Sequence, residues 1–480
     1  MKVNVFNTRI EILPYELGEL PKLEKRWSVW VTQEYRYDPI ACYYNNSKLI
    51  IPRGMSLSQL KTLTGASPSF IQETYVPAEM KFSYMMKSPP RDNNQTQSIN
   101  FLLSINGFEK YERRNQLVLN LETGMGKTYC AIYALMKEKK RTIVITHTTD
   151  IKDQWYKSFL KHSTIPEDRI LNVDSGKILE RILNFDNEII DKDVFVITHS
   201  LITDFGSAHG WESIREIFEH LRIGIKVIDE AHLCFKNTMM IDFFTNVPRN
   251  YYLTATFSRS DPKEEKIFNN AFSNAVKYGN NLETRKHVNY QFIFFNSEPT
   301  QLQQRQIKTN YGVSSYRYAD YAFGTDDYHS LERAIYLTLD HCLAREGRTL
   351  IVVPKIDNTE YLAKQIAEKY PATSVGTVNS KHSEDANRDV KENCDIIIST
   401  IKSLGVGSDI KKLRNLVIAE PHSSKLISNQ LIGRLREYSS EDDTYAYELV
   451  DVGFPLLMRM IKKRTSGIQK KCKTMSQCRI

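Results

Sequence analysis

Short apolar runs alternate with helix-length amphipathic segments from about residue 99 onward, and this alternation limits the fold more than any other feature. Five runs lie in the first half of this region, at residues 116–121, 142–146, 194–198, 225–229 and 251–255. The rhythm restarts later, with six runs at residues 290–295, 349–353, 374–378, 395–399, 415–419 and 446–450. Nearly continuous apolar strands that alternate with helices are typical of parallel sheets covered on both faces. We therefore predict an α/β fold with two tandem parallel-sheet domains.

The first 85 residues have a different character. They are rich in aromatic side chains, and short strand-like runs stop at turn signals such as the Pro-Arg-Gly at residues 52–54. We expect a small α+β accessory domain here, followed by a polar, proline-containing linker at residues 86–98. The chain thus divides into four predicted segments, at residues 1–90, 91–285, 286–455 and 456–480.

The last predicted segment carries the whole charge surplus of the chain. Lys and Arg number 65 against 57 Asp and Glu, which gives a net charge of +8, and the last 25 residues hold eight basic side chains and no acid. This basic tail would neutralise nucleic-acid phosphates and make binding depend on salt. The alternative is a solvated helix end followed by a frayed terminus. The sequence leaves both readings open.

Several classes of protein are excluded by composition. No apolar run reaches the roughly 20 residues of a membrane-spanning helix, and charges and prolines interrupt the N-terminus where a secretory signal would need an apolar stretch. The seven cysteines are scattered and form no CxxC pair, so we expect neither a disulfide framework nor a structural metal. We expect a cytoplasmic protein that has no membrane contact.

A candidate phosphate-binding loop follows the first apolar run, where residues 122–128 read Glu-Thr-Gly-Met-Gly-Lys-Thr and a helix is expected to begin. Glycines let the backbone curl so that amide hydrogens point at phosphate oxygens. Lys127 would reach the β- and γ-phosphates of ATP, and the Thr128 hydroxyl would hold Mg²⁺. The alternative is a chance Gly-Lys-Thr at a helix start. The residues expected to bind the nucleotide are Thr123, Gly124, Gly126, Lys127 and Thr128.

Two adjacent acids end the strand predicted at residues 225–229, where the chain reads Asp-Glu-Ala-His. The carboxyl ends of strands in an α/β sheet are where ligands bind. Asp229 can hold Mg²⁺, and Glu230 can orient and deprotonate an attacking water. Taken alone, the pair could equally be the N-cap of a helix. Together with Lys127 in the same predicted sheet, it favours a nucleotide-hydrolysing site.

These motifs and their order over residues 91–440 resemble superfamily 2 helicases of the DEAH type, which implies two RecA-like domains with ATP between them. Gln95 resembles the glutamine that reads adenine in that family. Residues 142–155 and 196–202 are similar to strand-contacting motifs, and residues 253–256 are similar to the motif that couples hydrolysis to domain movement. This resemblance implies that Thr146, Thr198 and Ser200 contact DNA. It also implies that His232, Thr254 and Thr256 couple ATP hydrolysis to domain movement.

The second predicted domain carries the remaining resemblance. Residues 399–410 look like the family's fifth motif, which places Thr400 against the nucleic-acid backbone and Asp409 near the nucleotide. Residues 430–436 are similar to QxxGRxxR, although the second arginine comes one residue early. The resemblance makes Arg434 the arginine finger. It adds Gln430 and Arg436 as further catalytic candidates.

Within the superfamily, the chain looks most like phage-encoded branch-migration helicases of the UvsW type. That resemblance implies an ATP-dependent DNA helicase that remodels forks, displacement loops and four-way junctions in replication, recombination or repair. It also implies that the N-terminal domain holds duplex DNA and that the protein works in the host cytoplasm. Separately, we expect a monomer. The alternatives are an RNA helicase, a duplex DNA translocase and an ATP-gated DNA clamp that separates no strands.

Overall fold

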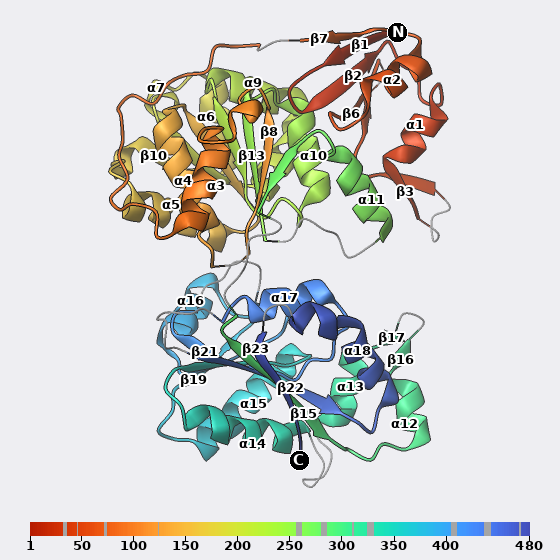
Figure 1. Ribbon diagram of the computed structural model, residues 1–480, viewed down its shortest axis with the longest axis vertical. Coiled ribbons are helices and arrows are strands. Elements are labelled where there is room, and N and C mark those ends of the chain that lie inside the picture. The colour runs from red at the N-terminus through yellow and green to blue at the C-terminus, as the bar shows by residue number, and fades with distance from the viewer. Residues whose placement is uncertain are drawn as a thin grey trace. The chain divides into compact units, whose positions relative to one another are not determined.

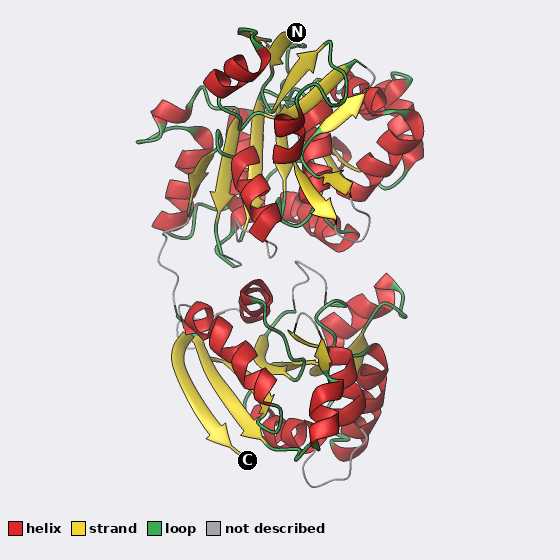
Figure 2. Ribbon diagram, turned by 90° about the vertical axis from the view of Figure 1, so that its right-hand side faces the viewer, coloured by secondary structure: helices red, strands yellow, loops and turns green. Residues whose placement is uncertain are grey.

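The computed structural model describes residues 1–31, 36–45, 47–71, 74–122, 124–255, 262–279, 286–309, 312–323, 331–404, 410–435, 443–469 and 472–480. The chain forms two compact units, Met1–Leu282 and Glu283–Ile480, and each contains a seven-stranded sheet (Figures 1 and 2). Among the described residues, no helix has both the length and the apolar character to span a membrane.

The sheet of the first unit has the strand order β10-β11-β9-β12-β13-β8-β14, and every neighbouring pair is parallel. This arrangement confirms the predicted parallel sheet. Alternate residues of one strand enter cores on opposite faces: Ile143 and Ile145 pack on one side and Val144 on the other. The strands are β8 (Gln116–Asn120), β9 (Thr142–Thr146), β10 (Ile170–Asn172), β11 (Val194–Thr198), β12 (Ile225–Ile228), β13 (Arg249–Thr254) and β14 (Val276–Tyr278).

Helices cover both faces of this sheet (Figure 2). The helix α3 (Asn93–Leu103) corrects the predicted linker, because Asp92 caps it by accepting a hydrogen bond from the Gln95 backbone at 2.9 Å. The other helices are α4 (Lys127–Glu138), α5 (Thr149–His162), α6 (Gly176–Leu183), α7 (Asn187–Ile190), α8 (His199–His209), α9 (Trp211–His220), α10 (Phe235–Phe244) and α11 (Pro262–Ala271), with 3₁₀ turns η1 (Glu109–Tyr111) and η2 (Glu167–Arg169).

The N-terminal residues 1–71, which we call the N-terminal module, form a separate small sheet with the strand order β5-β6-β2-β1-β7. Its α+β composition confirms the prediction. Figure 1 shows the module beside α10 and α11. Its elements are β1 (Lys2–Val5), β2 (Arg9–Leu13), α1 (Pro21–Arg26), the hairpin β3 (Ser28–Val31) and β4 (Arg36–Pro39), β5 (Tyr43–Asn45), β6 (Lys48–Pro52), α2 (Leu57–Thr64) and β7 (Pro68–Phe70).

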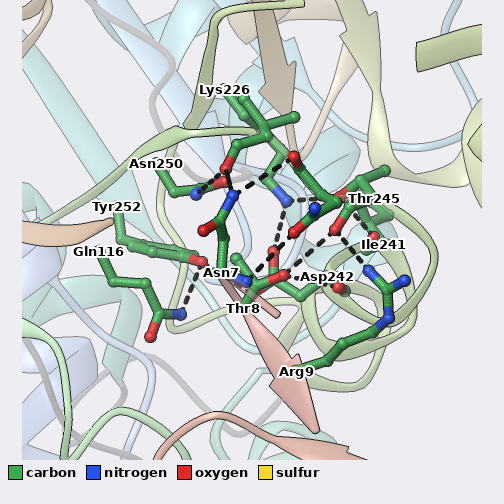
Figure 3. Close-up of polar contacts among 12 residues, drawn as sticks. Asn7, Thr8, Arg9, Gln116, Lys226, Ile241, Asp242, Thr245, Asn250 and Tyr252 are labelled. Atoms are coloured by element: carbon green, nitrogen blue, oxygen red, sulfur yellow. Dashed lines mark hydrogen bonds and ion pairs between the residues drawn. The ribbon is translucent and has the colours of Figure 1, made fainter. Parts of the chain in front are cut away.

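Buried polar contacts bind the module to the C-terminal end of helix α10 (Figure 3). Thr8 donates its hydroxyl to the carbonyl of Asp242 at 2.7 Å, and Arg9 donates to the carbonyl of Thr245 at 3.1 Å. The Asp242 carboxylate in turn lies 2.6 Å from the Lys226 ammonium, and both side chains are at most 1% exposed. At Gly54 the approach is so close that a Cβ would lie 2.1 Å from the backbone oxygen of Asn270. The module is therefore an integral part of the first unit.

The second unit repeats the architecture with the order β19-β20-β18-β21-β22-β15-β23, again parallel throughout. The doubled parallel sheet confirms the predicted tandem fold. The strands are β15 (Val288–Phe295), β18 (Arg348–Val352), β19 (Val375–Val378), β20 (Ile396–Ser399), β21 (Leu413–Ile418), β22 (Thr444–Asp451) and β23 (Cys472–Arg479). The helices are α12 (Gln301–Gln306), α13 (Ser315–Ala322), α14 (Leu331–Leu343), α15 (Ile356–Lys369), α16 (Glu384–Asn393), α17 (Lys425–Ile432) and α18 (Pro455–Gln469), with a hairpin of β16 (Lys308–Thr309) and β17 (Gly312–Val313).

Residues 456–480, the predicted basic tail, are built into this second unit. Helix α18 packs on α17, and β23 extends the sheet by pairing in parallel with β15. Arg464 is buried, whereas Arg459, Lys473 and Arg479 are exposed. The chain end therefore belongs to a sheet, and of the two readings of the tail, the alternative of a frayed terminus is wrong for the described residues.

Candidate active site

The predicted phosphate-binding loop lies between the end of β8 and the start of α4. Gly124 and Gly126 have φ values of +87° and +86°, in the left-handed region that glycine tolerates best. A Cβ at Gly126 would lie 2.4 Å from Gln95 Nε2, so this position also needs a residue without a side chain. Gln95, predicted to read adenine, contacts the loop directly: its Nε2 donates to the carbonyl of Met125 at 3.4 Å. Thr123 lies outside the described residues.

Lys127 opens α4 and points back across the loop. Its ammonium donates to the carbonyl of Leu121 at 3.1 Å and lies 3.7 Å from Glu230 Oε1. The side chain is only 10% exposed. The structure therefore brings the predicted phosphate-binding lysine and the predicted general base together, although they are far apart in sequence. Thr128 follows in the first turn of α4.

Asp229 is a buried carboxylate at the end of β12, with 6% of the residue exposed. One carboxylate oxygen accepts the indole N–H of Trp155 at 2.7 Å, and the other accepts the backbone N–H of Glu230 at 3.0 Å. Burial, with the neighbouring Glu230 charge, raises the pKa of Asp229 to about 6. A buried carboxylate of this kind is stabilised by a divalent cation, and Mg²⁺ prefers oxygen ligands. Asp229 and Thr128 thus fit the expected Mg²⁺ site.

Glu230 and His232 connect this site to the next strand. Glu230 has a φ of +47°, which is unusual for a residue with a side chain and marks a sharp turn after β12. His232 Nδ1 lies 3.3 Å from Glu230 Oε2 and 2.8 Å from the Thr254 hydroxyl at the end of β13. A continuous polar path therefore joins Glu230, His232 and Thr254. Thr256, also predicted to couple hydrolysis to movement, lies outside the described residues.

The predicted nucleic-acid contacts of the first unit gather at the same edge of the sheet. Thr146 and Thr198 are register partners at the ends of β9 and β11. The Thr198 hydroxyl lies 3.2 Å from that of Ser200 and caps α8 by accepting the Leu201 N–H at 3.3 Å. The Thr146 hydroxyl donates to the carbonyl of Thr148 at 3.2 Å. Ser200 is exposed, whereas Thr146 is buried, so Ser200 is the more accessible of these hydroxyls.

The second unit places its predicted residues around the turn after β20. Thr400 closes this turn: its hydroxyl accepts the Ser403 backbone N–H at 3.0 Å and donates to the Ser403 hydroxyl at 2.9 Å. Arg434 donates to the carbonyl of Leu404 at 3.5 Å, so its guanidinium lies beside the same segment. Gln430 lies on α17. Asp409 and Arg436 lie outside the described residues.

Two residues of the candidate site, Trp155 and Glu420, were not predicted from the sequence. Trp155 lies within residues 142–155, which resemble a strand-contacting motif, and its indole N–H donates to the Asp229 carboxylate. Glu420, after β21, accepts the backbone N–H of Ile401 at 3.1 Å, and burial raises its pKa to about 7. The Gln-Trp pair at residues 154–155 was a usable signal for the first. No sequence signal marked Glu420, because only the fold brings its strand end beside the turn at Thr400.

Two family models match the chain, one in each of the two α/β units. The "Type III restriction enzyme, res subunit" model matches residues 87–259, and the "Helicase conserved C-terminal domain" model matches residues 330–437. Together they indicate a superfamily 2 helicase. The helicase is accordingly an ATP-dependent enzyme that acts on nucleic acid, as the sequence predicted.

Relatives of the helicase come from viruses. "Transcript termination protein A18" of Yaba-like disease virus is 25% identical over 348 residues, which is 70% of this chain and 67% of the relative. "Putative helicase 161L" of Invertebrate iridescent virus 6 is 25% identical over 434 residues, which is 85% of this chain and 88% of the relative. The viral relatives agree with the predicted viral origin, but they do not name a phage.

Solved structures show the fold of the helicase. "S. cerevisiae Dbp5 bound to RNA and ADP BeF3" aligns with a TM-score of 0.53 at 14% identity and covers 81% of this chain and 89% of that chain. This likeness confirms the tandem RecA-like architecture. "The crystal structure of T4 UvsW" covers all of both chains at 15% identity, but its TM-score is 0.38. That value carries no argument for the branch-migration group.

Proposed function

We propose that this helicase is a DNA motor that hydrolyses ATP to displace strands in branched or duplex DNA. The observation that carries the proposal is the joined set of Lys127, Asp229 and Glu230 at one sheet edge, with His232 leading from it to Thr254. A lysine, two acids and a polar path to a neighbouring strand are what an ATPase needs if hydrolysis is to move other parts of the chain. The literal Asp-Glu-Ala-His sequence supports assignment to the DEAH type.

The residues of the first unit take complementary roles in this proposal. Glu230 would accept a proton from the attacking water, and Lys127 would stabilise the negative charge of the β- and γ-phosphates. Asp229 and Thr128 would hold Mg²⁺, which neutralises phosphate charge when bound. The Trp155 indole fixes the carboxylate of Asp229, so that the acid is oriented before any ligand arrives. Gln95, Thr123, Gly124 and Gly126 would complete the nucleotide contacts.

The second unit is proposed to supply the remaining catalytic groups. Arg434 would stabilise the charge that develops on the transferred phosphoryl group, as an arginine finger does. Gln430 and Arg436 would assist it, and Asp409 would contact the nucleotide. The hydroxyls of Thr146, Thr198, Ser200 and Thr400 would contact the phosphate backbone, which positions a strand without reading its sequence.

DNA is favoured over RNA by one observation. The first domain matches a family described as a restriction-enzyme subunit, and restriction enzymes cleave DNA. Within this proposal, branched DNA in replication, recombination or repair is the substrate class, and the N-terminal module would hold the duplex. We further propose that the protein acts as a monomer in the cytoplasm of a virus-infected host; sedimentation during turnover tests the monomer.

A second candidate function is displacement of RNA from a transcription complex. Its support is the printed name of the Yaba-like disease virus relative, a transcript termination protein. The same motor would serve both functions, because an RNA strand paired to a DNA template is also displaced by movement along DNA. The two candidates differ in substrate rather than in the ATPase site.

A strand-displacement panel tests these proposals. Labelled forks, 3′-tailed duplexes, four-way junctions, RNA–DNA hybrids and all-RNA duplexes are incubated with ATP, and Glu230→Gln serves as the inactive control. We expect displacement from the branched DNA substrates. Preference for the hybrid supports transcript release, and preference for all-RNA duplexes overturns the DNA assignment. ATP turnover without strand displacement on any substrate would favour a duplex DNA translocase or an ATP-gated DNA clamp.

A further inference from the structure

A charged side chain is completely buried in the last helix of the chain. Arg464 in α18 is 1% exposed and Glu448 in β22 is 5% exposed. The guanidinium binds both carboxylate oxygens, with Nη1 3.0 Å from Oε2 and Nη2 in contact with Oε1. Tyr290 also donates its hydroxyl to the same carboxylate. Removing two charges from water is costly, and the two-point contact between guanidinium and carboxylate offsets part of that cost, although Arg464 Nε has no hydrogen-bond partner among the described residues.

Arg464 makes one further bond that ion pairing does not require. Its Nη1 donates to the hydroxyl of Ser428 at 3.1 Å, in helix α17. That hydroxyl lies 3.0 Å from His422 Nε2, and His422 Nδ1 lies 3.2 Å from the carbonyl of Glu420. Burial lowers the pKa of His422 to about 4, so the imidazole is neutral at physiological pH.

One set of proton positions satisfies this whole chain of contacts. Arg464 donates to Ser428, Ser428 donates to His422 Nε2, and His422 donates through Nδ1 to the carbonyl of Glu420. The Ser424 carbonyl, 3.2 Å from the Ser428 hydroxyl, is the competing acceptor within α17. Because Arg464 can only donate, it fixes the Ser428 oxygen as an acceptor at one end of the chain.

The chain of contacts ends at the segment beside Arg434. The Glu420 carboxylate accepts the N–H of Ile401, and Arg434 donates to the carbonyl of Leu404 three residues further on. Helix α17, which ends at Ile432, two residues before Arg434, is therefore bonded to α18 through Ser428. The same contacts set the position of the segment on which the Arg434 guanidinium rests.

We propose that Arg464 is a positioning residue for Arg434: through Ser428, His422 and Glu420 it fixes α17 and the turn after Thr400. The inference rests on the proposed role of Arg434 as the arginine finger. It also gives one charge of the basic C-terminal segment an internal role in place of phosphate contact. A purely structural role would not need the ion, because apolar side chains of similar volume often replace a buried ion pair without loss of stability.

The test separates folding from positioning. In Arg464→Met/Glu448→Leu, both charges are removed and the packing volume is nearly kept, but the bond to Ser428 is lost. We expect a melting temperature within about 3 °C of the parent, an unchanged KM for ATP, and a kcat with saturating DNA reduced by roughly tenfold, because small misplacements of a catalytic group cost 10- to 100-fold. Arg459→Met, an exposed change on the same helix, is the matched control and should alter neither value.

Two further variants keep the inference open to refutation. Ser428→Ala removes only the relay hydroxyl, so it answers the question even if the double variant fails to fold, and we expect it to lower kcat by about threefold to fivefold. Combining either change with Arg434→Ala should cause no loss beyond Arg434→Ala alone, since Arg464 acts through that residue. Unchanged kcat in a folded double variant and in Ser428→Ala overturns the inference, as does an additive loss.

The result for Arg434→Ala alone distinguishes failure of the proposed arginine finger from failure of the proposed positioning role of Arg464. If that variant loses turnover while the Ser428 and Arg464 variants keep it, only the positioning inference fails. If Arg434→Ala itself keeps full turnover, the proposed arginine finger fails, and the positioning inference fails with it.

Discussion

Each of the two units contains a fully buried ion pair that attaches a terminal segment of the chain, but the pairs lie in different surroundings. In the first unit, Lys226–Asp242 lies under the N-terminal module, which reaches it through Thr8. In the second unit, Arg464 lies in the terminal segment itself, paired with Glu448, and also binds the helix that leads to Arg434. A buried ion pair therefore helps to attach the N-terminal module in the first unit. In the second unit, we propose, a buried ion pair positions Arg434.

The two pairs also differ in how firmly the charges are held. Burial lowers the pKa of Lys226 and raises that of Asp242, so burial opposes the charged form of both partners. Burial likewise opposes the charge of Arg464, yet the Glu448 carboxylate raises its pKa above the usual value. Both pairs therefore depend on their mutual attraction, and removal of one partner leaves an uncompensated charge.

The largest effect is expected at the catalytic residues of the first unit. Glu230→Gln keeps the shape of the side chain but removes the general base, so DNA-stimulated ATP hydrolysis should fall by at least about a hundredfold. Lys127→Ala should lose turnover on a similar scale, because charge on the phosphates is no longer stabilised. Steady-state phosphate release measures both, with circular dichroism as the control for folding. Unchanged turnover in either variant would refute the site assignment.

The next effect is on stability in the first unit. Asp242→Ala leaves the Lys226 ammonium buried without its carboxylate and should lower the free energy of unfolding by about 3–5 kcal/mol. Urea unfolding measures this change, and limited proteolysis reports whether the N-terminal module detaches. Lys226→Met/Asp242→Leu is the matched control and should recover most of the loss. An Asp242→Ala protein as stable as its parent would show that the Lys226–Asp242 pair does not stabilise the first unit.

A smaller effect is expected where the site meets the neighbouring strand. Thr254→Val removes the hydroxyl that bonds His232 without changing the volume of the side chain. ATP hydrolysis should stay within about threefold of the parent while strand displacement per ATP falls by roughly tenfold, the equivalent of one hydrogen bond of about 1.4 kcal/mol. Parallel assays of phosphate release and displacement measure the ratio. An equal loss in both assays would show that Thr254 supports hydrolysis rather than coupling.

The smallest effect is a pH dependence in the second unit. The pKa of Glu420 is raised to about 7 by burial, so the folded state binds its proton more tightly than the unfolded state does. Its contribution therefore makes the protein less stable as pH rises from about 4.5 to 7. His422 contributes with the opposite sign between about pH 4 and 6.5, because burial lowers its pKa to about 4 and the unfolded state therefore binds its proton more tightly. Urea unfolding from pH 5 to 8 should show the stability of Glu420→Gln rising relative to that of the parent as pH increases, because His422 is present in both proteins. Profiles that stay parallel would contradict the assignment.

The central strands of both sheets could be predicted because they are buried on both faces and read as continuous apolar runs. The edge strands β10, β14 and β23 were missed for the opposite reason: they are short or polar, and their sequence resembles loops. Strand β23 has only one buried residue, Cys472, so only its backbone pairing with β15 reveals it. Sequence patterns therefore found the cores of the sheets and not their borders.

The site was predicted in part for a similar reason. The residues Lys127, Glu230 and His232 lie in compact motifs, and the structure brings them together as expected. Asp242 and Arg464 carry no motif, since what distinguishes them is burial against partners on other elements. A basic residue in a charged segment is usually exposed, and both readings of the basic tail, phosphate contact and a solvated end, expect an exposed Arg464. Only packing shows that it is buried.

The most direct test of the central claim joins the ATPase site to movement on DNA. A labelled four-way junction or fork is mixed with the parent protein, and strand displacement and phosphate release are recorded together with ATP and with a non-hydrolysable analogue. We predict displacement that requires hydrolysis and is absent in Glu230→Gln. Displacement that persists with the analogue, or hydrolysis that DNA does not stimulate, would contradict an ATP-driven DNA motor.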